Sequence, residues 1–191
     1  MSDIPFYAAL ISTGTVAVAE IGDKTQLLAL LLAARFRKPW PIIWGILVAT
    51  LLNHALAGWL GSLAAKWLTP EVLRWVVAAS FIGIALWTLK PDKLDEDTAV
   101  PSRGAFIATT IAFFIAEIGD KTQVATVLLA AKYEPLWQVV AGTTVGMLLA
   151  NVPVVLLGSR FAAKLPLKAA RITAAVVFLL LGLWAAFKGI G

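Results

Sequence analysis

Long hydrophobic runs alternate with short polar turns along this chain. Six runs can be traced, over residues 4–36, 40–67, 72–89, 105–133, 136–163 and 167–187. The shortest of them is still close to the ~20 residues that a helix needs to cross a hydrocarbon core of ~30 Å. The pattern therefore predicts an all-α integral membrane protein with six transmembrane helices.

The first run is too long for one straight helix across a bilayer. As a continuous helix, residues 4–36 would be about 50 Å long against a hydrocarbon core of ~30 Å. We therefore expect this run to tilt, kink or break. Gly14 and Gly22 are the weak points of the run, and neighbouring Ser and Thr hydroxyls can satisfy backbone groups that a break would free.

The two halves of the chain repeat one another. The sequence Glu20-Ile21-Gly22-Asp23-Lys24-Thr25-Gln26 recurs letter for letter at 117–123, 97 residues later. The same offset aligns Gly45 with Gly142, Gly61 with Gly158, Phe81 with Phe178 and Trp87 with Trp184.

Three runs in each half is an odd number, so the second half must enter the membrane from the opposite side. This predicts an inverted repeat, the plan of many secondary transporters. We assign residues 1–90 to the first three-helix repeat, 91–103 to a polar linker and 104–191 to the second repeat, all in one membrane domain. The acidic run at 92–97 within the linker is interpreted as a solvated loop.

Basic residues predict the orientation, because Lys and Arg concentrate on the cytoplasmic side of a membrane protein. The turns after the first, third and fifth runs carry ten of them: Arg35, Arg37, Lys38, Lys90, Lys93, Arg103, Arg160, Lys164, Lys168 and Arg171. The other face carries four: Lys66, Arg74, Lys132 and Lys188. The count places both chain termini outside.

Composition narrows the function. The chain is 60% hydrophobic and 14% charged, which leaves too little polar surface for a soluble domain of this size. It has no Cys, which excludes disulfides and thiolate metal sites. The net charge of +5 is explained by lipid headgroups and orientation, so we expect no nucleic-acid partner. No cofactor is expected apart from a transported ion.

The repeated motif places carboxylates inside hydrophobic runs, where each Asp costs about 2.5–3.5 kcal/mol on insertion. On a continuous helix, Glu20, Asp23 and Gln26 would form a ladder of oxygens along one side. With the inverted copy facing it, the acids would converge near the membrane midplane. Carboxylate and amide oxygens suit hard cations such as Mn²⁺, Ca²⁺ and Mg²⁺. The predicted metal ligands are Glu20, Asp23, Gln26, Glu117, Asp120 and Gln123.

Several polar neighbours of these ligands have roles that the sequence leaves open. The motif lysines can form i,i+4 ion pairs with the glutamates, act as tethered cations or extend to an interface. The single histidine is either a proton relay or a packed, hydrogen-bonded side chain, and the asparagines either line the site or bond between helices. Supporting roles are therefore predicted for Lys24, Thr25, Lys121, Thr122, Asn53, His54 and Asn151.

The two E-x-G-D-(K/R)-(T/S) motifs, each in the first run of a repeat, resemble those of the small cation/proton exchangers that include the Golgi calcium/manganese transporters and bacterial manganese exporters. The resemblance covers the whole chain. It implies export of Mn²⁺ or Ca²⁺ against protons, with Glu20, Asp23, Glu117 and Asp120 as the ion-binding acids and Thr25 and Thr122 at the last motif position. The short chain resembles the bacterial branch, which favours manganese and the bacterial inner (plasma) membrane.

Three mechanisms are compatible with buried carboxylates. The leading hypothesis is an antiporter in which a divalent cation and protons alternately occupy the same acids. A passive cation channel with an acidic ring is the second. An intramembrane aspartyl protease using Asp23 and Asp120 is the third, although the adjacent lysine and the extra glutamate in each copy argue against an enzyme. Four carboxylates and two lysines sum to −2, which predicts electroneutral exchange of one divalent cation for two protons.

Overall fold

The computed structural model describes residues 6–91, 104–158, 163 and 165–188 of the chain. Within these residues the protein is entirely helical. Eight helices are described: α1 (Tyr7–Ala19), α2 (Lys24–Phe36), α3 (Pro39–Trp67), α4 (Pro70–Thr88), α5 (Ala105–Glu117), α6 (Lys121–Lys132), α7 (Leu136–Leu157) and α9 (Leu167–Lys188). Except for residue 91, the predicted linker 91–103, with its acidic run and the basic residues Lys93 and Arg103, lies outside the described residues. The same holds for Arg160 and Lys164.

Four of the described helices, α3, α4, α7 and α9, are long and apolar enough to cross a membrane. They correspond to the second, third, fifth and sixth hydrophobic runs, and α7 ends earlier than its run, at Leu157. The first and fourth runs each form two short helices in place of one, α1 with α2 and α5 with α6. The all-α prediction is therefore confirmed for the described residues, with four helices that could span a membrane, and the expected break in the first run is present.

The breaks occur at the glycines of the motifs. Gly22 has a φ of 81° and Gly119 a φ of 72°, in the left-handed region that glycine enters without steric cost. In each break the amide oxygen of the motif glutamine accepts a hydrogen bond from the glycine N–H, over 2.8 Å for Gln26 and 2.7 Å for Gln123. The motif thus carries the residues that break the helix and those that stabilise the break.

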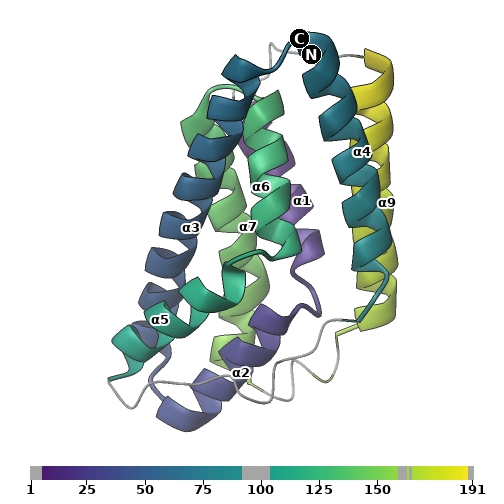
Figure 1. The fold of residues 1–191 in the computed structure, drawn as a ribbon. Coiled ribbons are helices and arrows are strands. Elements are labelled where there is room, and N and C mark those ends of the chain that lie inside the picture. The colour runs from purple at the N-terminus through teal and green to yellow at the C-terminus, as the bar shows by residue number, and fades with distance from the viewer. Residues whose placement is uncertain (1–5, 92–103, 159–162, 164, 189–191) are drawn as a thin grey trace.

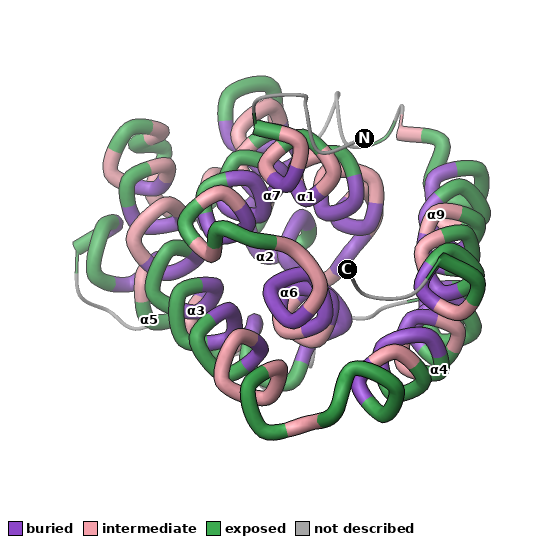
Figure 2. Tube along the Cα trace, turned by 90° about the horizontal axis from the view of Figure 1, so that it is seen from above, coloured by how far each residue is buried: buried purple, intermediate pink, exposed green. Residues whose placement is uncertain are grey.

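The long helices pack against the broken helices of the opposite half. Helix α7 contacts α1 and α2, whereas α3 contacts α5 and α6. Helices α3 and α7 also contact each other, and α4 pairs with α9 on one side of the bundle (Figures 1 and 2). The two motif copies therefore lie inside the bundle, each held by a helix from the other half.

Glycines allow close crossings between the long helices and the broken ones. A Cβ on Gly142 would lie 2.4 Å from the Ala9 carbonyl oxygen of α1, and a Cβ on Gly45 would lie 2.9 Å from the Phe106 carbonyl oxygen of α5. Both distances are too short for a methyl group, so the backbones meet directly. The two contacts are equivalent at the offset of 97 residues, since Ala9 aligns with Phe106 as Gly45 aligns with Gly142.

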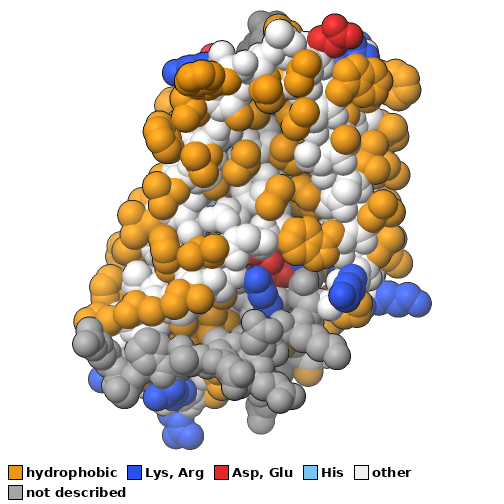
Figure 3. Space-filling model, viewed as in Figure 1, with side chains coloured by type: hydrophobic (Ala, Val, Ile, Leu, Met, Phe, Trp, Pro, Cys, Tyr) orange, Lys and Arg blue, Asp and Glu red, His pale blue; other side chains and the backbone are white. Residues whose placement is uncertain are grey.

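The outer surface is hydrophobic and the interior contains the polar groups. Large exposed side chains include Leu52, Leu56, Trp59, Leu149 and Leu156, and Figure 3 shows hydrophobic side chains over most of one face, with Lys and Arg near its two ends. The acids and hydroxyls of both motifs and the amide of Gln26 are buried instead. This distribution is the one expected of a protein whose sides face lipid.

Candidate metal-binding site

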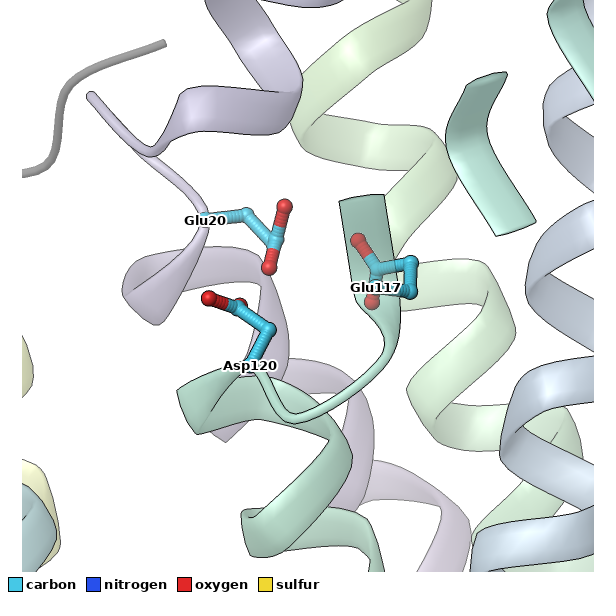
Figure 4. A group of neighbouring side chains, drawn as sticks. All are labelled: Glu20, Glu117 and Asp120. Atoms are coloured by element: carbon cyan, nitrogen blue, oxygen red, sulfur yellow. The ribbon is translucent and has the colours of Figure 1, made fainter. Parts of the chain in front are cut away.

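Three carboxylates from the two motif copies converge between the helix breaks. Glu20 follows the last residue of α1, Glu117 is the last residue of α5 and Asp120 precedes the first residue of α6. Glu20 and Glu117 are completely buried and Asp120 is 2% exposed. One oxygen of each lies within 4.8 Å of the others, and Figure 4 shows the three side chains pointing toward one another.

This spacing suits a shared divalent cation. Metal–oxygen bonds of about 2.1–2.5 Å place two ligands of one ion up to about 5 Å apart. Three buried carboxylates of the same sign also repel each other unless a cation or protons neutralise them. The sequence predicted that acids of both motifs would converge, and the structure brings three of the four together.

The fourth acid, Asp23, is engaged by the opposite motif. Its carboxylate is buried and forms an ion pair with Lys121. In the reciprocal position, Lys24 Nζ lies 3.2 Å from Asp120 Oδ1. Each motif lysine therefore pairs with the aspartate of the other copy. The i,i+4 spacing does not set these pairings, because the helix breaks between each glutamate and its lysine.

The two crossed pairs differ in exposure. The side chains of Lys121 and Asp23 are 3% and 0% exposed, whereas those of Lys24 and Asp120 are 27% and 2% exposed. The Lys24 end of the cluster therefore reaches the surface and the Lys121 end does not.

Motif threonines orient the carboxylates. The Thr25 hydroxyl lies within hydrogen-bonding distance of Glu20 Oε2, at 2.5 Å. The Thr122 hydroxyl lies 3.1 Å from Asp120 Oδ2 and 3.4 Å from Glu117 Oε2. The predicted supporting role of both threonines is thus accompanied by direct contacts to the acids.

The amide side chains connect the breaks to the long helices. Besides accepting from Gly22, Gln26 donates to the Ala150 carbonyl of α7 over 2.8 Å, and Gln123 donates to Asn53 of α3 over 3.4 Å. Asn53 in turn donates to the Phe114 carbonyl of α5 over 3.0 Å. Through these hydrogen bonds the amide side chains stabilise the breaks and connect them to α3 and α7. That Gln26 and Gln123 bind metal stays a prediction.

The prediction that Glu20, Asp23 and Gln26 line one side of a single helix is wrong. Gly22 ends the helical path, so Glu20 closes α1 while Asp23 precedes α2. The three-residue spacing therefore does not set their relative positions. Turn geometry does, and it directs Asp23 to Lys121 and Gln26 to the glycine N–H.

Sequence reasoning named every acid of the cluster but missed the exchange of lysine partners. A signal for it was present: if two copies face each other with opposite polarity, the adjacent Asp and Lys of one copy lie beside the Lys and Asp of the other.

His54, on α3, has its Nε2 atom 3.8 Å from Glu117 Oε2. Its counterpart Asn151, on α7, donates to the Met147 carbonyl over 3.1 Å.

The chain is similar to known membrane transporters. The family model described as "Divalent cation/proton antiporter GDT1" matches residues 8–96 and 105–191. A Vibrio cholerae protein named "Putative manganese exporter" is 58% identical over 178 residues, which cover 93% of this chain and 89% of that protein.

More distant relatives carry the family name. A GDT1-like protein of Synechocystis is 26% identical, with 86% of this chain and 89% of that protein covered. GDT1-like protein 5 of Arabidopsis thaliana is 24% identical, with 87% and 89% covered. No solved structure matches the chain significantly.

Proposed function

The chain belongs to the GDT1 family of divalent cation/proton antiporters, and on that basis we propose that it exports Mn²⁺, or Ca²⁺, in exchange for protons at its buried carboxylate cluster. Family membership confirms the resemblance drawn from the two motifs and places the protein among transporters. The observation that carries the proposal is the convergence of Glu20, Glu117 and Asp120 within 4.8 Å. The name of the Vibrio cholerae relative favours Mn²⁺.

The proposed architecture is six membrane spans in two inverted repeats, with the broken pairs α1–α2 and α5–α6 each counted as one span. Equivalent contacts at the offset of 97 residues support it, among them the two glycine crossings and the two Lys–Asp pairs. Phe81 and Phe178 occupy equivalent positions in the two halves, and their rings are stacked with centroids 6.2 Å apart. The basic residues favour termini on the outside of the bacterial inner membrane.

The crossed ion pairs refine the charge balance of the proposed mechanism. Lys121 compensates Asp23 and Lys24 compensates Asp120, so the remaining −2 belongs to Glu20 and Glu117. One divalent cation or two protons would neutralise it. Because uncompensated charge is expensive in hydrocarbon, only a loaded cluster would reorient, which gives electroneutral exchange. The same pairs argue against an aspartyl protease, in which two aspartates share a proton, because here each aspartate is paired with a lysine.

The experiment that tests this function is metal flux into proteoliposomes. With Mn²⁺ at equal concentration on both sides, a pH gradient that is acidic inside should drive Mn²⁺ uptake against its rising gradient. The rate should be the same when potassium and valinomycin hold the membrane potential at different values. Glu20→Gln is the control, because it removes one of the two uncompensated charges.

Two outcomes would contradict the proposal. A passive channel would equilibrate Mn²⁺ without accumulating it under the pH gradient. A flux that changes clearly with membrane potential would refute the charge balance while leaving proton coupling in place.

A further inference from the structure

Resting on the proposed function, we infer that His54 supplies a nitrogen ligand to the transported cation and thereby makes the site favour Mn²⁺ over Ca²⁺. His54 lies on α3, outside both motif copies, and its side chain is 0% exposed. It is the only histidine of the chain, which also has no cysteine. A nitrogen donor in this protein's metal site can therefore come from only one imidazole.

The distance to Glu117 fits two ligands of one ion. Nε2 of His54 lies 3.8 Å from Glu117 Oε2, which is longer than the ~2.7–3.2 Å of a hydrogen bond. With metal bonds of about 2.2 Å, two ligands at ~90–120° from each other stand about 3–4 Å apart. An ion bound to Glu117, one of the three carboxylates of the cluster, can therefore reach the imidazole.

The imidazole has no hydrogen bond that would make it a packing residue. Neither Nδ1 nor Nε2 is bonded to any other described residue, and Glu117 Oε1 and Glu20 Oε1 are likewise buried without a hydrogen bond in the described part of the chain. A buried polar group without a partner costs about 1–3 kcal/mol. A cation between these groups would satisfy the nitrogen and the carboxylates together.

The equivalent position in the second half carries no such donor. Asn151 directs its amide nitrogen to the Met147 carbonyl, so the two halves are alike in their acids and differ at this residue. Ca²⁺ takes oxygen ligands. Mn²⁺ also favours carboxylate oxygens, but as a first-row transition-metal ion it gains more than Ca²⁺ from one nitrogen donor added to them. One imidazole added to the carboxylates therefore stabilises Mn²⁺ more than Ca²⁺.

The direct test is pulsed electron paramagnetic resonance of Mn²⁺ bound to the purified full chain, from which any histidine tag has been removed, in a buffer free of nitrogen ligands. The Mn²⁺ spin echo should be modulated by an imidazole ¹⁴N nucleus. Protein grown with ¹⁵N-labelled histidine should replace that modulation with a ¹⁵N signal, because only one residue is labelled. Bound Mn²⁺ without nitrogen modulation would overturn the inference and leave the proposed function intact. Failure to bind Mn²⁺ at all would overturn both.

A substitution of His54 tests whether the imidazole makes the site favour Mn²⁺ over Ca²⁺. His54→Asn introduces the residue found at the equivalent position and replaces the nitrogen donor with an amide oxygen. The affinity for Mn²⁺ should fall on the order of tenfold while that for Ca²⁺ stays the same or rises, as measured by titration calorimetry with each metal. Equal losses for both metals would show a packing role and contradict the inference. Where the variant does not fold, the measurement on labelled wild-type protein decides.

Discussion

Removing the lysine of the buried crossed pair should destabilise the protein far more than removing the lysine of the exposed one. Lys121 is 3% exposed and faces fully buried Asp23, whereas Lys24 is 27% exposed. Breaking a buried pair from one side costs about 3–5 kcal/mol, because it leaves a buried charge uncompensated. The Lys24–Asp120 pair is intermediate, because Asp120 is buried but Lys24 is 27% exposed, so solvent can partly replace the lysine. Lys121→Gln should therefore cost more unfolding free energy than Lys24→Gln, by on the order of 1–3 kcal/mol.

A double-mutant cycle separates the pair from other effects of the substitutions. The variants are Lys121→Gln, Asp23→Asn and their combination, and unfolding by denaturant in detergent micelles can be followed by the fluorescence of the 8 Trp residues. The double variant should be less destabilised than the sum of the singles, by up to about 3 kcal/mol. The same cycle on Lys24 and Asp120 is the matched control.

Two results would refute this reasoning. Equal losses in Lys24→Gln and Lys121→Gln would mean that exposure does not distinguish the pairs. Additive losses in Lys121→Gln and Asp23→Asn would mean that these two side chains do not stabilise each other.

Three further predictions concern transport, coupling and packing. Neutralising any one of the four motif acids should nearly abolish Mn²⁺ uptake into proteoliposomes without preventing membrane insertion; the variants are Glu20→Gln, Asp23→Asn, Glu117→Gln and Asp120→Asn. Wild-type uptake in two of these variants would exclude a shared site. Lys24→Gln should leave the metal-loaded cluster at −1, so its Mn²⁺ flux should slow or become dependent on membrane potential, in contrast to the wild type. Gly61→Ala should lower the midpoint of thermal unfolding, because its Cβ would lie 2.1 Å from the Val127 carbonyl oxygen, whereas Gly83→Ala, with no atom within 4 Å, should not.

Much of this fold is predictable because the membrane limits the choices. A hydrophobic run of sufficient length must be helical, since lipid offers no partner to free backbone groups. The excess length of residues 4–36 and the glycine within its motif predict a break, and Gly22 provides it. The candidate acids can be identified from the free energy of membrane insertion alone, because a carboxylate within a hydrophobic run is costly to insert and is therefore expected to have a function.

The details of the site were less accessible from sequence. Helical periodicity places Glu20, Asp23 and Gln26 on one side only while the helix continues, and a single positive φ at Gly22 removes that relation. The choice of ion-pair partner is a second limit, because Lys24 has Glu20 four residues before it yet pairs with Asp120 of the other motif copy. The contact of His54 with Glu117 joins residues on separate helices, α3 and α5, that no spacing rule connects.

The crossed pairs also explain why the site needs both motif copies. Within one copy, a glutamate, an aspartate and a lysine sum to −1, and the adjacent Asp and Lys do not neutralise each other because each points to the other copy. Separating the copies would take the buried side chains Asp23, Asp120 and Lys121 from their partners, and breaking a buried pair costs several kcal/mol. The copies are therefore held together at the point where Glu20 and Glu117 meet. Since the lysines compensate the aspartates, a cation that enters must be shared by two glutamates from different copies, and its binding is thereby coupled to the relative position of the two broken helices.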